Sequence, residues 1–170
     1  MSLGYKWMSS PVGPLKLVAG DEGLAAVLWA QDDPRRVPLP ALREAPAHPV
    51  LCQAERELDA YFAGRRRAFS VPLAFRGSDF QKRVWTLLLG IPFGETRTYG
   101  QLAGQLGDVK ASRAVGAANG RNPISIIAPC HRVVGANGQL TGFAGGLEAK
   151  AALLRLEAAQ KLDAPVLQDA

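Results

Sequence analysis

Short apolar stretches separated by turn-forming residues open the chain, a pattern that is typical of strands. Lys6–Ser9 and Leu15–Ala19 flank a turn at Pro11–Pro14, and Leu24–Trp29 follows a second turn at Asp21–Gly23. Consecutive strands joined by short turns usually lie next to each other in a sheet. We therefore predict a small antiparallel meander at this end of the chain.

A proline-rich segment and then a helix follow the meander. Residues 31–47 contain four prolines, which indicates a loop. Apolar residues then recur at helical spacing from His48 to Ala63, and Gly64 ends this helix. Phe69–Phe75 is predicted to return as a strand. The cationic run between them, Arg65-Arg66-Arg67, is interpreted as a solvated turn rather than a phosphate clamp.

Capping boxes mark two helix starts in the second half of the chain. Ser78-Asp79-Phe80-Gln81 begins one helix, and Thr98-Tyr99-Gly100-Gln101 begins a short one that Gly107 closes. Asp108 can cap a third helix over Ala111–Asn119. Two short helices joined by a tight turn are the outline of a helix-turn-helix. The outline alone is weakly specific, because most such helix pairs only pack against each other.

The rest of the pattern predicts a buried strand and a last helix. Ile124–Ala128 is apolar and largely β-branched, which predicts a buried strand, and Leu147 to about Lys161 is predicted to be helical. The whole pattern predicts an α/β (α+β) protein with a boundary at Gly77. Residues 1–77 would form a small antiparallel-sheet subdomain with a helix. Residues 78–170 would form a mostly helical subdomain that contains the helix-turn-helix.

Composition narrows the class of protein. Of the 170 residues, 48% are hydrophobic and 21% are charged, as in ordinary globular domains. We find no secretory signal, and the apolar runs are too short to cross a bilayer. We therefore expect a cytoplasmic protein with no membrane partner. The 20 Lys and Arg residues exceed the 15 Asp and Glu residues by five, and this charge would suit a nucleic acid.

The two cysteines and two histidines do not form the pattern of a metal site. A cytoplasmic protein should keep Cys52 and Cys130 reduced. His48 and Cys52 are four residues apart and could share an ion on one helix face. Cys130 and His131 are adjacent, however, and adjacent side chains rarely converge on one tetrahedral ion. We expect no metal, and we interpret Cys52 as a small buried apolar residue.

Cys130 and His131 are candidates for nucleophilic chemistry. A free thiol is mostly protonated at neutral pH, so a nucleophilic cysteine needs a base, and His131 is the only one nearby in sequence. If this dipeptide is extended, the two side chains point to opposite sides and a bridging water becomes the natural proton path. Glu157 could hold the other imidazole nitrogen. Taken alone, the dipeptide favours a buried structural cysteine beside a capping histidine.

Longer motifs change this balance. The segments Arg113-Ala-Val-Gly116, Asn122-Pro123, Pro129-Cys-His-Arg-Val133 and Gly142-Phe-Ala-Gly-Gly146 closely resemble those of the O6-alkylguanine-DNA alkyltransferases. The resemblance extends from about Gly77 to Gln160, and the N-terminal subdomain matches only in outline. The Pro-Cys-His-Arg-Val segment with an upstream Asn-Pro is highly specific.

The resemblance implies DNA repair by irreversible, single-turnover transfer of an alkyl group to Cys130. The donor would be O6-alkylguanine in double-stranded DNA, with O4-alkylthymine and the range of adduct sizes left open. His131 would be the water-mediated base, Glu157 would orient His131, and Asn122 would hold the turn at the mouth of the active site. No cofactor is implied, and the protein would act as a monomer bound in the minor groove.

The resemblance also assigns residues that bind the base and the duplex. Tyr99 would donate to the departing guanine, the Val133 carbonyl and the Ala144 amide would read the edge of the base, and Lys150 would support the pocket. Arg113 would fill the gap that the extruded base leaves. The other residues assigned to DNA contact, on the helix that carries Arg113, are Ala114, Ala117 and Asn119.

Several alternatives stay open at this point. Tyr99 could be only a first-turn helix residue, Arg113 a solvated one, Lys150 an exposed stem and Glu157 an acid on a wet helix face. Phe143-Ala144 stands where some family members have Tyr-Ser, and the N-terminal zinc ligands of some relatives are absent.

Three other functions compete with repair. An alkyltransferase-like protein that binds lesions without repairing them would lack Cys130. A cysteine hydrolase could use Cys130 and His131 with Asn122 or Glu157, although hydrolases usually bring the histidine from a distant segment. A helix-turn-helix regulator would need no chemistry.

Overall fold

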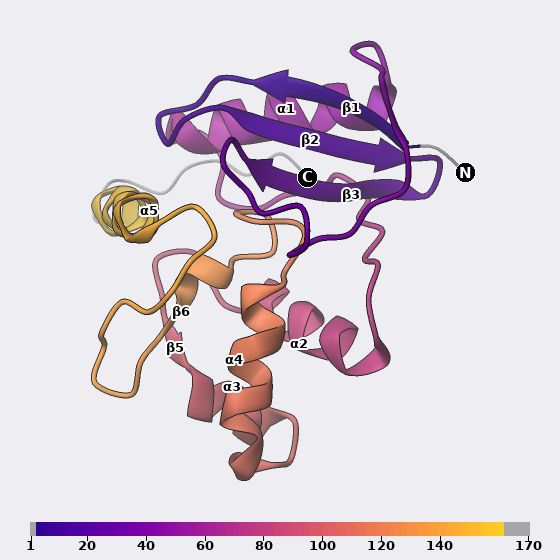
Figure 1. Ribbon diagram of the computed structural model, residues 1–170. Coiled ribbons are helices and arrows are strands. Elements are labelled where there is room, and N and C mark those ends of the chain that lie inside the picture. Colours follow the sequence, from indigo (N-terminus) through magenta and orange to yellow (C-terminus); the bar gives the residue numbers. More distant parts are fainter. Residues whose placement is uncertain (1–2, 162–170) are drawn as a thin grey trace.

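The N-terminal half contains a four-stranded sheet with a helix on one face (Figure 1). The computed structural model describes residues 3–161. The strand order is β3-β2-β1-β4, and the β1-β2-β3 meander is antiparallel, which confirms the predicted arrangement. The strands are β1 (Leu3–Met8), β2 (Leu15–Gly20), β3 (Gly23–Trp29) and β4 (Leu42–Glu44).

Strand β4 corrects the prediction that residues 31–47 form only a loop. It pairs in parallel with β1, with Leu3 opposite Leu42 and Tyr5 opposite Glu44. The backbone amide of Ala45 extends this pairing by donating to the Tyr5 carbonyl at 2.9 Å. A three-residue strand lies between prolines because an edge strand needs hydrogen bonds on one side only.

Helix α1 (Pro49–Phe62) packs against the sheet and agrees with the predicted helix. His48 is its N-cap, and the His48 ring accepts a hydrogen bond from the Val50 amide at 3.1 Å. Cys52 is only half-buried, and its thiol lies 3.3 Å from the Pro46 carbonyl. The expectation of a buried Cys52 is therefore wrong.

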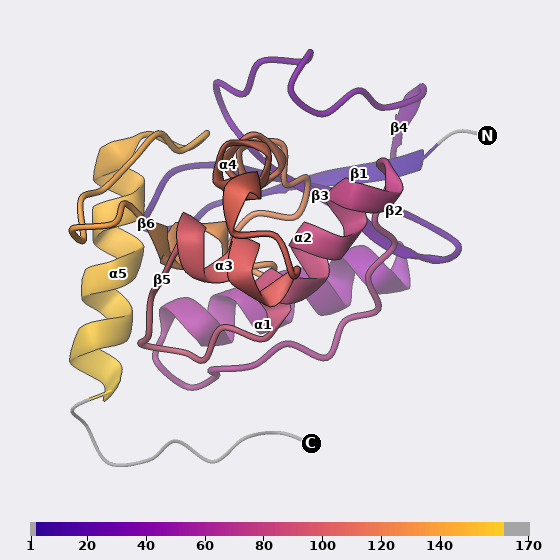
Figure 2. The same ribbon diagram turned by 90° about the horizontal axis from the view of Figure 1, so that it is seen from below.

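The second half is mostly helical, as predicted. Both capping boxes are present: the Ser78 and Thr98 side chains accept from the amides of Gln81 and Gln101, whose side chains accept from the cap residues in return. Figures 1 and 2 place the last helix beside a two-stranded parallel pair. The elements are α2 (Asp79–Leu89), β5 (Arg97–Thr98), α3 (Tyr99–Gln105), η1 (Val109–Ala111), α4 (Ser112–Gly120), η2 (Cys130–Arg132), β6 (Val133–Val134) and α5 (Leu147–Lys161).

Helices α3 and α4 pack against each other across a tight connection. Gly107 has a positive φ of 86°, which ends α3 in a conformation that glycine adopts without strain. Asp108 does not cap α4 itself. Its carboxylate accepts from the Lys110 amide at 3.0 Å and caps the intervening 3₁₀ turn η1 instead.

The predicted strand Phe69–Phe75 is not a strand. The Leu24 amide donates to the Pro72 carbonyl at 2.8 Å and the Ala74 amide donates to the Leu24 carbonyl at 2.8 Å, which makes one isolated bridge. Proline has no N–H, so Pro72 cannot continue a hydrogen-bonded ladder.

The cationic run before that segment is also different from the prediction. Arg66 is buried and lies 3.4 Å from the Glu57 carboxylate, and the Glu57 carboxylate also accepts from the Ser70 amide at 2.9 Å. Arg67 donates to the Gln160 carbonyl on α5. Two of the three arginines therefore connect parts of the fold, and only Arg65 is an exposed turn residue.

The main apolar core joins both sides of Gly77. It contains Leu17 of the sheet, Leu58 of α1, Ile124 of the loop before η2 and Leu153 of α5. A second cluster surrounds Trp85 of α2 and includes Cys130. No helix within residues 3–161 is long and apolar enough to cross a membrane.

Candidate active site

Cys130 lies at the start of η2, after a compact loop that Asn122 organises. The Asn122 side-chain amide donates to the Ala128 carbonyl at 2.7 Å, and its oxygen accepts from the Ile124 amide at 3.0 Å. Inside this loop Ile126 has a φ of 74°, which is strained for a β-branched residue. The loop stores this strain because Asn122 and the buried Ile126 side chain together hold its shape.

This geometry corrects two expectations. Ile124–Ala128 is buried as predicted, but it forms turns with one bridge to Val27 rather than a strand. The Cys130–His131 step is part of a 3₁₀ turn and not extended, so the argument that their side chains must point to opposite sides does not apply.

The sulfur of Cys130 is enclosed, with 4% of the residue exposed. Burial raises the pKa of the thiol, while hydrogen bonds from Asn122 and Ser125 and the nearby charges of Arg36 and Lys150 lower it. Burial is the largest of these effects, so the resting side chain is a thiol. A nucleophilic role for this sulfur would therefore require a base to take its proton.

His131 follows Cys130 in the chain and pairs with Glu157. Its Nε2 lies 2.7 Å from Glu157 Oε2, and both side chains are buried. Burial lowers the pKa of His131 more than Glu157 raises it, so the imidazole is neutral at physiological pH. Because Glu157 is ionised, Nε2 carries the hydrogen and Nδ1 keeps the lone pair. Within residues 3–161, Nδ1 has no hydrogen-bond partner, which leaves this nitrogen available to accept a proton.

Glu157 accepts hydrogen bonds from Arg132, Tyr61 and Gly94 as well as pairing with His131. Arg132 Nε donates to Oε1 at 2.8 Å and Arg132 Nη2 donates to Oε2 at 3.0 Å. The Tyr61 hydroxyl donates to Oε2 at 2.6 Å, and the Gly94 amide donates to Oε1 at 3.2 Å. Hydrogen bonds from His131 and Arg132, together with the Arg132 charge, outweigh burial and lower the pKa of Glu157 to about 2. The alternative of an acid on a wet helix face is therefore wrong.

Lys150 is buried, which excludes the exposed-stem alternative. Its ammonium group donates to the Val133 carbonyl at 2.6 Å and to the Thr141 carbonyl at 3.3 Å. Burial lowers the pKa of Lys150. The Tyr99 hydroxyl is hydrogen-bonded to the Thr141 hydroxyl, so Tyr99 and Lys150 both hold the loop that carries the exposed Ala144.

Helix α4 presents most of the residues that the sequence assigned to DNA contact. Arg113, Ala114 and Ala117 are exposed. Asn119 is buried, with 5% exposure, so its side chain does not share the exposed face of α4. The buried Val115 and Ala118 share the inward side of α4 with Asn119.

Three side chains that the sequence did not single out also reach this site. Arg36 donates to the Gly120 carbonyl at 3.1 Å and to the Asn122 carbonyl at 2.8 Å, and an ion pair with Asp32 holds its guanidinium. Tyr61 and Arg132 contact Glu157, as described above. Arg132 belongs to the motif that contains Cys130, so the sequence offered a signal for it; Arg36 and Tyr61 had none.

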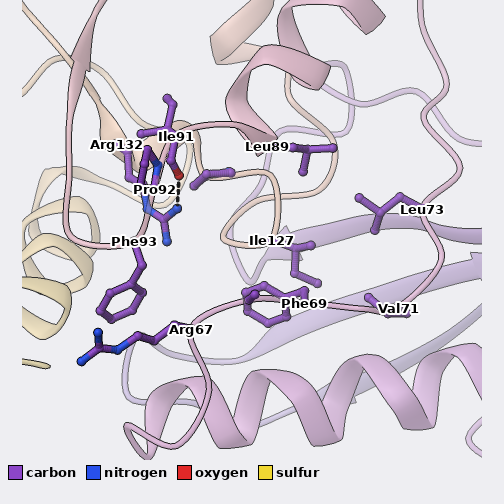
Figure 3. Close-up of a pocket in the computed structure, with 12 residues that line it drawn as sticks. Arg67, Phe69, Val71, Leu73, Leu89, Ile91, Pro92, Phe93, Ile127 and Arg132 are labelled. Atoms are coloured by element: carbon purple, nitrogen blue, oxygen red, sulfur yellow. Dashed lines mark hydrogen bonds between the residues drawn. The ribbon is translucent and has the colours of Figure 1, made fainter. Parts of the chain in front are cut away.

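A cavity of about 320 Å³ lies near the site but does not include the sulfur (Figure 3). Its walls are mainly apolar, from Phe69, Leu73, Phe93 and Ile127. The Arg132 guanidinium lies at the edge of this cavity. It donates to the Ile91 carbonyl at 2.6 Å, so its hydrogen bonds are made within the protein. Elsewhere, no three His, Cys, Asp or Glu side chains of the described part of the chain come together as metal ligands would.

Comparison with known proteins gives a consistent result for both halves of the chain. Two family models match: the ribonuclease-like domain of 6-O-methylguanine DNA methyltransferase over residues 3–75 and its DNA-binding domain over residues 79–159. A methylated-DNA–protein-cysteine methyltransferase of Methanosarcina acetivorans is 50% identical over 153 residues, which cover 90% of this chain and 97% of the relative.

Two crystal structures from Mycobacterium tuberculosis are also similar. The O6-methylguanine methyltransferase is 46% identical with a TM-score of 0.81, and the match covers 96% of this chain and 95% of that one. The second is the OGT protein in complex with DNA, 47% identical with a TM-score of 0.81, and the match covers 92% and 94% of the two chains.

Proposed function

The chain belongs to the 6-O-methylguanine DNA methyltransferase family, and from this premise we propose that Cys130 is the residue that takes the alkyl group from DNA. The protein repairs DNA by direct transfer of an alkyl group to a cysteine. Of its two cysteines, Cys52 lies on α1 beside the Pro46 carbonyl, and the nearby His48 ring is occupied as the N-cap of that helix. Cys130 adjoins the His131–Glu157 pair, and this pairing is the observation that carries the proposal.

The proposed reaction is a displacement at carbon. The sulfur of Cys130 attacks the alkyl carbon of O6-alkylguanine, the carbon–O6 bond breaks, and its electrons stay with the guanine. The thiol proton passes through a water to Nδ1 of His131, and Glu157 stabilises the imidazolium that forms. Tyr99 donates to the guanine as it leaves. The product on Cys130 is a thioether, which thiol exchange cannot cleave, so each molecule reacts once.

Entry of the base requires local displacement because the sulfur is almost enclosed. The Tyr99 hydroxyl has to give up its hydrogen bond to the Thr141 hydroxyl and form one with the base. Val133 and Ala144 then offer a carbonyl and an amide to the base edge, with the Val133 carbonyl still held by Lys150. Asn122 maintains the turn that aims Cys130 toward this opening.

DNA binding is assigned to α4. The small residues Ala114 and Ala117 allow the helix backbone to approach the duplex closely, which suits docking in the minor groove. Extruding a base costs a few kcal/mol, and Arg113 is placed to fill the gap that remains. The scheme uses residues of one chain, so we propose that a monomer acts. We also propose a division of the chain at Gly77 and a cytoplasmic location, where both thiols would stay reduced.

Mass spectrometry of the protein after reaction with a duplex containing O6-methylguanine tests the proposal. The peptide containing Cys130 should gain one methylene group, once per molecule, without added cofactor. Cys130→Ser should abolish transfer, and Cys52→Ser should leave it complete. Full repair of the duplex with Cys130 unmodified, or a methyl group on Cys52, would overturn it.

A further inference from the structure

Tyr61 brings the N-terminal half of the chain into the active site. It lies on α1, 96 residues before Glu157, yet its hydroxyl is 2.6 Å from Glu157 Oε2. The side chain is fully buried. Other residues of α1 contact the sheet and the core, and Tyr61 is the residue of this helix whose side chain meets the His131–Glu157 pair in the structure of residues 3–161.

An aromatic cluster fixes the direction of the Tyr61 hydroxyl. The Tyr61 ring lies edge-on to Phe62, with centroids 5.3 Å apart, and edge-on to Phe93, with centroids 6.2 Å apart. Phe69 packs against it at 5.6 Å. Edge-to-face contacts of this kind are favourable and restrict the ring. Burial and the Glu157 charge raise the pKa of Tyr61 far above its usual range, so the hydroxyl stays protonated and donates.

We propose that Tyr61 is a positioning residue for repair: its hydroxyl fixes Glu157 Oε2 and thereby sets the orientation and the basicity of His131. The proposal rests on the function proposed above for Cys130 and His131. It gives the N-terminal subdomain a direct part in the reaction rather than support alone.

Three donor groups share the Oε2 oxygen of Glu157. This oxygen accepts from Tyr61 Oη, His131 Nε2 and Arg132 Nη2. The charged groups that face His131 are Glu157 and Lys150 on α5 and Arg132 on η2, with Tyr61 on α1 as the added neutral donor. Each donor takes up part of the negative charge of Oε2, so removing one leaves more charge facing the imidazole.

The consequence is a change in both rate and pH dependence. In Tyr61→Phe the Glu157 carboxylate loses one of its fixed contacts, and His131 Nε2 loses a rigid partner. We expect the single-turnover rate of alkyl transfer to fall by about tenfold, which corresponds to about 1.4 kcal/mol of barrier. Extra charge on Oε2 also raises the pKa of His131. Because the base must be neutral to accept a proton, the pH below which repair slows should move upward.

Two control variants separate this effect from a loss of stability or of a hydroxyl group. Leu58→Val removes a methylene group from the same face of α1 without touching Glu157. Tyr5→Phe removes a tyrosine hydroxyl whose contact is Glu44, at 3.5 Å on the sheet. Neither control should shift the pH midpoint. Binding of alkylated duplex to Tyr61→Phe should match wild type, because Tyr61 is fully buried and its hydroxyl contacts Glu157.

A second replacement keeps the size of the ring. Site-specific 3-fluorotyrosine at residue 61 makes the hydroxyl a stronger donor, so the pH midpoint should move downward, opposite to Tyr61→Phe. The proposal is overturned if both replacements leave the midpoint at the wild-type value, or if Tyr61→Phe slows repair only as much as Leu58→Val. Wild-type protein that never methylates Cys130 would instead contradict the proposed function itself.

Discussion

The ammonium group of Lys150 donates a hydrogen bond to the backbone carbonyl of Val133, at 2.6 Å, three residues after Cys130. The same nitrogen reaches the Thr141 carbonyl at 3.3 Å. One buried side chain therefore joins α5 to β6 and to the loop that carries Thr141. A lysine is suited to this position because its ammonium group has three donors and no acceptor.

Replacing Lys150 should lower the free energy of unfolding by more than the loss of its charge alone would, because a buried carbonyl also loses its donor. Lys150→Met keeps most of the apolar stem and leaves the Val133 carbonyl without its donor. An unsatisfied buried polar group costs about 1–3 kcal/mol, and we expect the free energy of unfolding to fall by that amount in urea titrations. Alkyl transfer should also slow, since the Thr141 segment loses a contact. Lys82→Met, at an exposed position of α2, should change neither quantity.

Equal stability of the two variants would show that Lys150 is dispensable for the structure. A Lys150→Met protein that is destabilised yet transfers the methyl group at the wild-type rate would separate the structural contact from the reaction.

Stability should decline in two stages as the pH falls. Folding lowers the pKa of His131 from 6.5. Below a pH of about 6.5, His131 is protonated in the unfolded chain but stays neutral in the folded protein. The free energy of unfolding therefore decreases as the pH falls. The pKa of Glu157 falls from 4.5 to about 2 on folding, so its contribution is complete above 4.5 and is lost as the pH falls toward 2. The Glu157 contribution is about 3 kcal/mol.

Thermal or urea unfolding between pH 8 and pH 3 measures this decline. Glu157→Gln should start from a lower stability at neutral pH and lose the second stage, because an amide does not titrate. A second stage of unchanged size in Glu157→Gln would show that other carboxylates cause it.

Local signals predicted the helices well and parts of the site poorly. Ser78 and Thr98 predict where their helices begin, because a capping box is a short-range sequence pattern. Ile124–Ala128 was mistaken for a strand because a buried strand and a buried turn have the same apolar composition. What decides between them is the Asn122 side chain, which occupies the amide and carbonyl that a ladder would use.

The sequence predicts the pair Cys130 and His131, but it does not predict the tyrosine that holds Glu157 in place. Cys130 and His131 lie in one motif, and Glu157 could be assigned by resemblance. Tyr61 had no signature, since a tyrosine at helical spacing among Leu51 and Leu58 is typical of an ordinary core residue. Its role depends on a contact between segments 96 residues apart, which only the tertiary structure supplies.

Two glycines of the loop over the site should respond differently to the same substitution. A Cβ on Gly145 would lie 2.6 Å from the Trp29 ring, while a Cβ on Gly142 would have nothing within 4 Å. Trp29 cannot retreat freely, because its Nε1 donates to Ser125 Oγ at 3.1 Å. In Gly145→Ala the loop therefore has to move, together with the Ala144 amide that we assign to the base.

Misplacement of reacting groups by about 1 Å can cost on the order of a hundredfold in rate, so Gly145→Ala should slow single-turnover methyl transfer by about tenfold or more. Gly142→Ala should react as fast as wild type, because the added methyl group meets open space. Quenched-flow measurement of the methylated Cys130 peptide distinguishes the two variants. If Gly145→Ala and Gly142→Ala transfer at the same rate, the packing of this loop on Trp29 does not position the base, and the Ala144 assignment loses its structural support.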